Sequence, residues 1–530
     1  MRHAAFQRPL SREGKGTAMP VWNVVRKGVY HDSVMLMRLT HHLESVHGVR
    51  RGAAMMGTPS NRALLRDAGL LTPDGDSASP NDLIIAVDAD DMAAAHAGVQ
   101  AATTALSASP PVVYSSSTLY RPRTLRAALK MLDAADLALI SVPGLYAGFE
   151  AMKALRSGLH VMLFSDNVPL ATEIELKHLA IAQGLLMMGP DCGTAIINGV
   201  PLGFANVVPR GRIGLAAASG TGLQEVACLI AAAGEGISQA LGVGGRDLSD
   251  DVGGLMMRQV LDILATDPAT EVVCMLGKPP GPGTWEHLQD QLARLEKPCV
   301  VHCAGLVSEA GSSWHAAATL EDAAHVSVAL ARGVKPKPIE FTIPSREIEA
   351  LIANATRLPQ SGQRFVHGIY AGGTLAYEAL SLLQAKLIDV IPGVEGGGEG
   401  HTVVDLGNDV FTVGRPHPML DGTLRREWIL KAANHPSTAV ILLDVVLGYG
   451  AHPDPVGELL PAIQQGTRLA QAAGRHVTVV ASVCGTEQDP QRRAAQVDAL
   501  QAHGVIVMPS NAQAARLAAG IAARLVESPS

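Results

Sequence analysis

Ser219–Glu225 reads SGTGLQE, and the same pattern returns as GGTLAYE at Gly372–Glu378. Each heptad follows a run that predicts a buried strand, GRIGLAAA before the first and RFVHGIY before the second. A longer stretch, LATDPATEVVCML (264–276), recurs as KAANHPSTAVILLD (431–444). The offset between the copies grows from 153 to 168 residues, so the second copy carries an insertion. Self-similarity over this length predicts two related domains rather than an array of short repeats.

The heptads have a physical interpretation as anion sites. A small-residue turn between a strand and a helix presents unpaired N–H groups and the positive end of the helix dipole, which favour phosphate or carboxylate. We expect the two turns, one per copy, to face one anion. The alternative, that Ser219, Thr221 and Thr374 only cap ordinary helices, stays open. The candidate phosphate-binding or substrate-binding residues are Ser219, Gly220, Thr221, Gly222, Gly372, Gly373 and Thr374.

Composition excludes several classes of protein. With 530 residues the chain should hold three or four domains. The 47% apolar and 17% charged content suits a large parallel-sheet protein with subunit contacts, so we expect an oligomer. A net charge of −7 and 3% aromatic residues argue against a nucleic-acid binder.

The lack of a recognisable targeting signal and the cysteine usage together predict a cytoplasmic protein. The six cysteines form no CxxC pair, which predicts reduced core thiols. No apolar run reaches the roughly 18 residues of a membrane span, so we expect no membrane partner. Residues 1–20 lack the apolar core of a secretory signal and are expected to be a disordered tail.

Alternating strand and helix signals divide the rest of the chain. VWNVVRKGVY and NDLIIAVDAD predict strands of a small α+β domain, and ADLALISVP, LHVMLFSDN and LLMMGPDCG alternate with helical stretches in a doubly wound Rossmann-type pattern. Both repeat copies predict parallel, flavodoxin-like α/β domains. The expected divisions are 21–110 for the N-terminal α+β domain, 111–205 for the Rossmann-type domain, 210–335 for the first copy, 336–361 for a linker and 362–525 for the second copy.

The residues also resemble a known family. The stretch 135–169, MGPDCGTAIINGVPLGF (188–204), the first heptad and GVGGRDLSDDVGG (242–254) resemble, in order, the α subunit of succinyl-CoA synthetase from its CoA-binding domain through its ligase domain. The chain is most similar to FdrA proteins. That resemblance rests on residues 27–61, HPMLDGTLRR (417–426) and LLDVVLGYGAHPDP (442–455).

The resemblance implies a CoA-binding-like domain followed by two ligase-like domains. It also implies carbamoyl transfer between oxalurate or oxamate and phosphate in ureide and purine catabolism, with companion carbamoyltransferase subunits. Phosphate and carbamoyl phosphate would be substrates, so the ligand is a small anion. VVYSSSTLY (112–120) corresponds to the glycine-rich CoA turn but contains no glycine. The sequence therefore assigns no cofactor with certainty, and CoA binding stays open.

Two alternative functions remain. The first is an acyl-CoA synthetase subunit that uses CoA and a phosphohistidine, for which His315 in SSWHAAATLEDAA is the candidate. Since no ATP-grasp domain is visible, a nucleotide-driven ligation would need a partner. The second is a non-catalytic scaffold that binds metabolites.

Three further candidate residues follow predicted strands. Asp191 and Cys192 lie in the tight turn GPDCGTA, as catalytic residues or as an Asx turn that fixes the loop. His452 follows the glycines of LLDVVLGYGAHPDP and could move a proton, and Gly450 would let the backbone approach a ligand. The alternative there is a rigid exit from the strand. VEGGGEGH (394–401) is expected to be a loop, and no metal site is expected.

Overall fold

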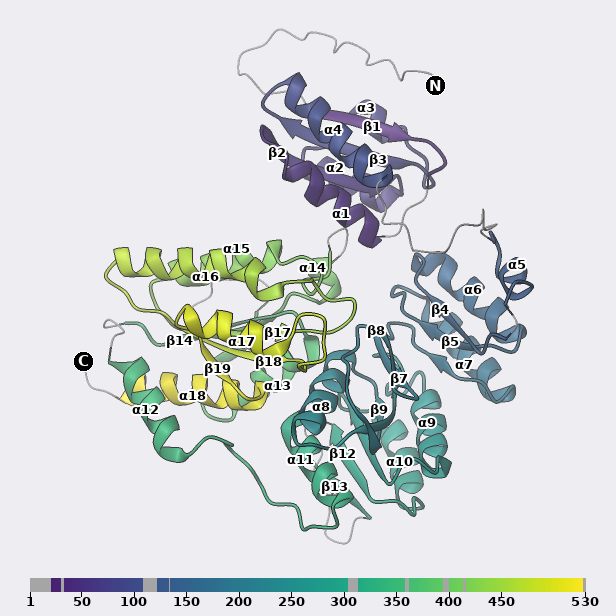
Figure 1. The fold of residues 1–530 in the computed structure, drawn as a ribbon, viewed down its shortest axis with the longest axis vertical. Coiled ribbons are helices and arrows are strands. Elements are labelled where there is room, and N and C mark those ends of the chain that lie inside the picture. The colour runs from purple at the N-terminus through teal and green to yellow at the C-terminus, as the bar shows by residue number, and fades with distance from the viewer. Residues whose placement is uncertain are drawn as a thin grey trace. The chain divides into compact units, whose positions relative to one another are not determined.

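The computed structural model describes residues 21–29, 33–107, 122–132, 134–303, 313–357, 362–393, 400–412 and 416–527, in two compact units, Met1–Leu119 and Tyr120–Ser530 (Figure 1). The expected tail at 1–20, the 112–120 stretch and most of VEGGGEGH lie outside the described residues.

The first unit is a small α+β domain. Its antiparallel sheet has the order β1-β3-β2. The central strand β3 is buried along its whole length, and the side chains of β3 point alternately into two apolar clusters, one on each face of the sheet. The strands expected at VWNVVRKGVY and NDLIIAVDAD are confirmed as β1 and β3. The elements are β1 (Val21–Arg26), α1 (Ser33–Glu44), β2 (Val49–Met56), α2 (Pro59–Asp67), α3 (Pro73–Asp76), β3 (Leu83–Ala89) and α4 (Met92–Ser107).

The second unit begins with the predicted Rossmann-type alternation of strands and helices. The described strands of this Rossmann-type part form a parallel three-stranded sheet with the order β4-β5-β6. The elements are α5 (Leu125–Leu129), β4 (Leu137–Ile140), α6 (Gly144–Arg156), β5 (His160–Leu163), α7 (Leu170–Ala182) and β6 (Met187–Met188).

The first repeat copy forms a seven-stranded sheet with the order β13-β12-β11-β9-β10-β7-β8. The hairpin β7–β8, from the stretch that we expected in the Rossmann-type domain, pairs with β10 in this sheet. The elements are β7 (Thr194–Ile197), β8 (Val200–Gly203), β9 (Arg210–Ala217), α8 (Gly220–Ala232), β10 (Ile237–Gly242), α9 (Leu255–Thr266), β11 (Val272–Gly277), α10 (Pro282–Leu292), β12 (Cys299–Cys303), β13 (Trp314–Ala316) and α11 (Leu320–Ala331).

The second copy forms a six-stranded parallel sheet with the order β15-β16-β14-β17-β18-β19. The elements are α12 (Ser345–Thr356), β14 (Phe365–Tyr370), α13 (Gly373–Gln384), β15 (Val390–Pro392), β16 (His401–Asp405), α14 (Asp409–Thr412), α15 (Thr423–Asn434), β17 (Thr438–Val446), α16 (Pro455–Ala472), β18 (Thr478–Cys484), α17 (Arg493–Ala502), β19 (Ile506–Met508) and α18 (Asn511–Glu527). Helix α12, within the stretch expected as a linker, packs on α18, where Ile352 meets Gly520.

The two copies share one topology. Numbered within each copy, the shared strands run 2-1-3-4-5 in both sheets, which is the flavodoxin-like order. The predicted fold class, a Rossmann-type domain, two flavodoxin-like domains and a small α+β domain, is therefore confirmed. One apolar cluster contains buried residues of both copies, so the copies pack on a common core through α8, α11, α13 and α18 (Figure 1).

Two further findings concern the whole described chain. All six cysteines are buried and unpaired. Within the described residues, no helix combines the length and apolar character needed to cross a membrane.

Candidate functional site

The starts of α8 and α13 meet at the contact between the two copies. Ser219 caps α8, and its Oγ accepts the Gly222 N–H at 3.0 Å while hydrogen-bonding the Thr374 hydroxyl of the other copy. A Cβ added to Gly372, which caps α13, would lie 3.1 Å from Thr221 Cγ2. The structure thus brings the two heptads together, and each helix follows the carboxyl end of the first strand of its repeat copy, β9 for α8 and β14 for α13.

The side chains around the two starts differ. At α8, a Cβ on Gly220 would lie 3.2 Å from the Thr194 hydroxyl, which itself donates to the Phe204 carbonyl at 2.7 Å. At α13, a Cβ on Gly373 would lie 2.7 Å from the Asp405 carboxylate. The α8 start is therefore neutral where the α13 start is acidic.

A buried ion pair supports the α13 start. Asp444 accepts the N–H groups of Ala371 and Gly372 at 2.9 and 2.8 Å. Arg425 Nη2 lies 2.9 Å from Asp444 Oδ1 and also donates to the carbonyl oxygens of Ile369 and Asp444. Both side chains are buried, so the two charges compensate each other away from water. Sequence reasoning missed Arg425, although the HPMLDGTLRR motif contains it.

His452 lies next to this ion pair but does not contact the α8 start in any described interaction. Its Nδ1 accepts the Asp454 N–H at 3.1 Å, and its Nε2 lies 3.8 Å from Glu458. With Ala371 and Arg425 it lines a cavity of about 10 Å³, the space of a single water. The structure therefore places His452 beside the α13 start, and its role in proton transfer stays a prediction.

The glycines before His452 serve a contact within the chain. Gly448 and Gly450 have φ of +112° and +81°, which glycine adopts without strain. Side chains there would meet the Ala205 carbonyl at 2.6 Å and the Phe204 ring at 2.8 Å. The close approach that the structure shows at Gly450 is thus to the Phe204 segment, and an approach to a ligand stays a prediction.

His417 is a second residue that sequence reasoning missed. Its ring lies 6.3 Å from the Phe204 ring, and its Nδ1 accepts the Met419 N–H at 3.2 Å. Burial lowers the pKa of His417 to about 4, so it is neutral at physiological pH. The motif HPMLDGTLRR was again the signal in the sequence, because His417 opens it.

Asp191 and Cys192 lie in a turn beside β10. The Cys192 Sγ donates to the Gly242 carbonyl at 3.4 Å, and burial raises its pKa to about 12. The thiol is therefore protonated and packed, which does not fit the catalytic role considered for it. Asp191 has φ of +56° and its N–H donates to the Ser165 carbonyl at 3.0 Å, as expected of a residue that fixes a turn.

His315 lies away from the paired helix starts. It is exposed on the edge strand β13. Across the sheet, His315 lies opposite Val300, Val300 opposite Cys274, and Cys274 opposite Leu215. Leu215 lies four residues before Ser219. Three strand spacings of about 4.8 Å and four residues of about 3.3 Å put the Cα atom of His315 roughly 20 Å from that of Ser219. This placement gives no support to a phosphohistidine at the paired starts.

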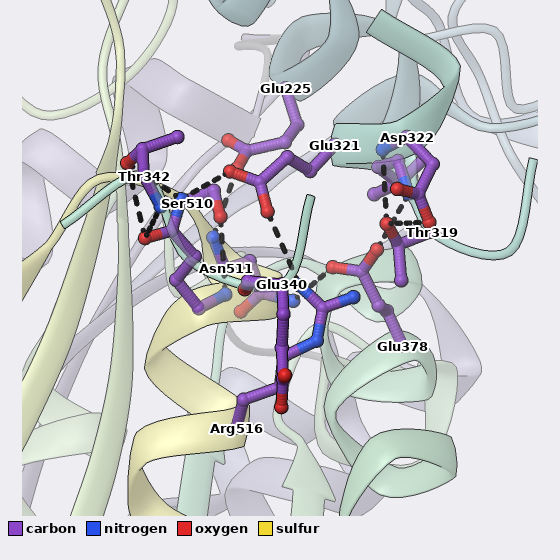
Figure 2. Close-up of polar contacts among 12 residues, drawn as sticks. Glu225, Thr319, Glu321, Asp322, Glu340, Thr342, Glu378, Ser510, Asn511 and Arg516 are labelled. Carbon is purple, nitrogen blue, oxygen red and sulfur yellow. Dashed lines mark hydrogen bonds and ion pairs between the residues drawn. The ribbon is translucent and has the colours of Figure 1, made fainter. Parts of the chain in front are cut away.

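The last residue of each heptad joins the copies by a reciprocal exchange (Figure 2). Glu225 on α8 accepts the N–H of Asn511 at the start of α18 at 3.1 Å, and Glu378 on α13 accepts the N–H of Leu320 at the start of α11 at 2.7 Å. Asn511 also donates its side-chain amide to Glu378 at 2.7 Å. Burial raises the pKa of Glu225, and that of Glu378 to about 7. A glutamate of each copy thus caps the start of a helix in the other copy, and these contacts hold α8 and α13 side by side.

Comparison with known proteins gives the chain a family. Residues 369–521 match the CoA-ligase family, and residues 19–117 match the heavy metal-associated domain of AllF. The uncharacterized protein YahF of Escherichia coli (strain K12) is 38% identical over 514 residues, which cover 94% of this chain and 98% of that protein. The chain belongs to the YahF family.

More distant relatives of this YahF family member are CoA ligases. The α subunit of succinate–CoA ligase [ADP-forming] from Aquifex aeolicus is 29% identical over 194 residues, 36% of this chain and 62% of that protein. The chain is therefore succinyl-CoA ligase α-like over about a third of its length. ATP citrate lyase from Methanothrix soehngenii, solved with citrate and coenzyme A, aligns over 76% of this chain and 84% of that chain at 13% identity and a TM-score of 0.34.

The residues of the N-terminal domain do not fit the heavy metal in its family description. Soft metals are held by thiolates, and no cysteine precedes Cys192 in the chain. In the part of the chain that the structure describes, no three His, Cys, Asp or Glu side chains are grouped to hold a metal ion.

Proposed function

We propose that this chain is a subunit of an acyl-CoA ligase-type enzyme that handles phosphate or an acyl phosphate at the start of α8. The observation that carries the proposal is the meeting of the two heptads, in which Thr374 of the second copy hydrogen-bonds the cap Ser219 of the first. The CoA-ligase match and the succinate–CoA ligase relatives support this choice of reaction class.

The chemistry of the α8 start suits a phosphoryl group. The first N–H groups of a helix have no intrahelical acceptor, and the dipole adds partial positive charge. Among the described contacts, the Ser219 hydroxyl accepts the Gly222 N–H and no acceptor is described for the N–H groups of Gly220 and Thr221, which leaves these two for an anion. The three residues Ser219, Gly220 and Thr221 are half-buried, so a ligand can reach them while its field is little screened.

The reaction is a transfer between phosphate and a thioester. A phosphate oxygen attacks the acyl carbon of an acyl-CoA, the C–S bond breaks, and the thiolate takes a proton to give an acyl phosphate and free CoA. Fixed N–H donors would hold the phosphate charge and stabilise the developing oxyanion. Companion subunits would supply the nucleotide step, and we infer that the chain works within an oligomer.

A second candidate is carbamoyl transfer, as the resemblance to FdrA proteins implies. The placement of His315, roughly 20 Å from Ser219 by the strand spacings given above, agrees with this reaction, which needs no phosphohistidine. A phosphate oxygen would attack the carbamoyl carbon of oxalurate, and the C–N bond would break as the nitrogen takes a proton. The products are carbamoyl phosphate and oxamate.

Two assays on the full-length protein, with and without co-purified subunits, separate the candidates. The first mixes succinyl-CoA with phosphate and measures free thiol, and the second mixes carbamoyl phosphate with oxamate and measures phosphate release. We expect thiol release in the wild type and at least about a hundredfold less in Gly220→Val, in line with the loss of an oxyanion donor. Phosphate release without thiol release would favour carbamoyl transfer, and neither signal would contradict both.

A further inference from the structure

The duplication supplies an internal reference for the two helix starts. At the offset of 153 residues, Ala218 and Ser219 of the first copy align with Ala371 and Gly372 of the second. The Ala218 N–H donates to the Leu276 backbone carbonyl at 2.9 Å. The equivalent N–H of Ala371 donates instead to a side chain, the carboxylate of Asp444.

The residues that differ between the copies change together. At the offset of 168 residues, Asp444 aligns with Leu276 and Arg425 aligns with Met257, so two buried apolar residues are replaced by a buried ion pair. The cap changes as well, because a Cβ on Gly372 would lie only 3.1 Å from Asp444 Oδ2. Glycine at the cap thus makes room for the carboxylate.

A further acidic replacement surrounds the same start. Strand register pairs Ala217 with Gly242 in the first copy and Tyr370 with Asp405 in the second, so Asp405 takes the place of a glycine. Arg425 compensates Asp444 but leaves the charge of Asp405, which would repel an incoming phosphate, and at short range this repulsion outweighs a helix dipole of about half a charge.

We propose that the start of α13 is an anion pocket that the protein fills with its own Asp444 carboxylate, so that the substrate anion binds at α8 alone. The pocket consists of the Arg425 guanidinium and the N–H groups of Ala371 and Gly372, which all contact that carboxylate within 2.9 Å. The assignment of the substrate anion to α8 rests on the proposed function. The occupied pocket does not.

Emptying the pocket tests the proposal. Asp444→Gly removes a CH₂–COO⁻ group and leaves Arg425 unpaired and buried, so the variant should unfold at a lower temperature than the wild type. Formate or acetate should then refill the pocket and raise the unfolding midpoint of this variant by roughly 3 °C or more, in a saturable manner. Chloride at equal ionic strength controls for salt.

The first copy provides the matched control. Leu276→Gly opens a space at the aligned position with Met257 in place of Arg425, so formate should give it no more stabilisation than it gives the wild type. Equal effects of formate on the two variants, or no effect on Asp444→Gly, would overturn the occupied pocket. If Asp444→Gly does not fold unaided, its refolding yield with and without formate replaces the midpoint, with the same two outcomes.

A separate measurement addresses the α8 assignment. Titration of the wild type with inorganic phosphate should give one bound ion per chain, lost in Gly220→Val. Two bound ions would overturn the exclusive assignment to α8. No phosphate binding at all, together with formate rescue of Asp444→Gly, would reject the proposed function while leaving the occupied pocket standing.

Discussion

Lys177 is a buried cation that joins the Rossmann-type domain to the first repeat copy. Its Nζ contacts Glu173 Oε1 and Asp247 Oδ1 at 2.7 Å each, and donates to the Val243 carbonyl at 3.2 Å. Since Lys177→Met would leave two buried carboxylates without this partner, we expect a loss on the order of 3 kcal/mol in the free energy of unfolding. The urea midpoint of the first transition measures it.

Lys153 in α6 is the matched control for this prediction. It pairs with Glu150 one turn away at 2.8 Å, but both side chains are exposed, at 46% and 39% of their accessible surface. Lys153→Met should therefore cost less than about 0.5 kcal/mol. Similar losses in the two variants would mean that burial of the Lys177 cluster does not matter.

At the residue scale the sequence predicted part of the site. The heptads were recognised because they are local, and the structure does bring Ser219 and Thr374 into contact. The ion pair was missed because Arg425 and Asp444 belong to different elements and meet only when α15 packs beside β17. The aligned copies carried the signal, since Met257 and Leu276 change to opposite charges together.

At the scale of elements, the reciprocal caps between α8, α11, α13 and α18 give a pH prediction. Burial raises the pKa of Glu378 to about 7, so between its ordinary value of 4.5 and about 7 the folded protein holds a proton that the unfolded chain releases. The contribution of Glu378 to stability is thus full below pH 4.5 and falls as the pH rises to about 7.

Glu378→Gln should remove this dependence. A single group contributes at most about 1.4 kcal/mol per pH unit, and the difference between wild type and variant isolates it from the other titrating groups. We therefore expect the variant to gain stability relative to the wild type as the pH rises from 4.5 to 7. A difference that stays constant across this range would show that Glu378 does not titrate there.

Prediction of the elements themselves succeeded where apolar runs were long. Strands β9, β11, β14, β17 and β18 lie within the apolar runs from which strands were expected. Strand β10 (ISQALG) has polar residues within it, β13 has only three residues, and β16 directly follows the glycine-rich stretch, so no clear pattern marked them. Helix α12 was missed because proline-rich residues precede it.

At the scale of the whole second unit, the common core predicts that the two copies depend on each other. Fragments 1–340 and 341–530 divide the chain before α12, which packs on α18 and belongs with the second copy. Each fragment alone would expose one side of the apolar cluster that both copies share. Co-expressed fragments should copurify and bind phosphate, whereas neither should bind it alone. Full binding by 1–340 alone would make the second copy dispensable for the site.

The central claim is that an anion binds at the start of α8, and calorimetric titration of the full-length protein with phosphate tests it most directly. Valine at Gly220 would place methyl groups beside the N–H donors, where a Cβ alone already lies 3.2 Å from the Thr194 hydroxyl. The account predicts saturable binding in the wild type and none in Gly220→Val, with circular dichroism and oligomeric state unchanged. Binding of equal affinity in both proteins would contradict it.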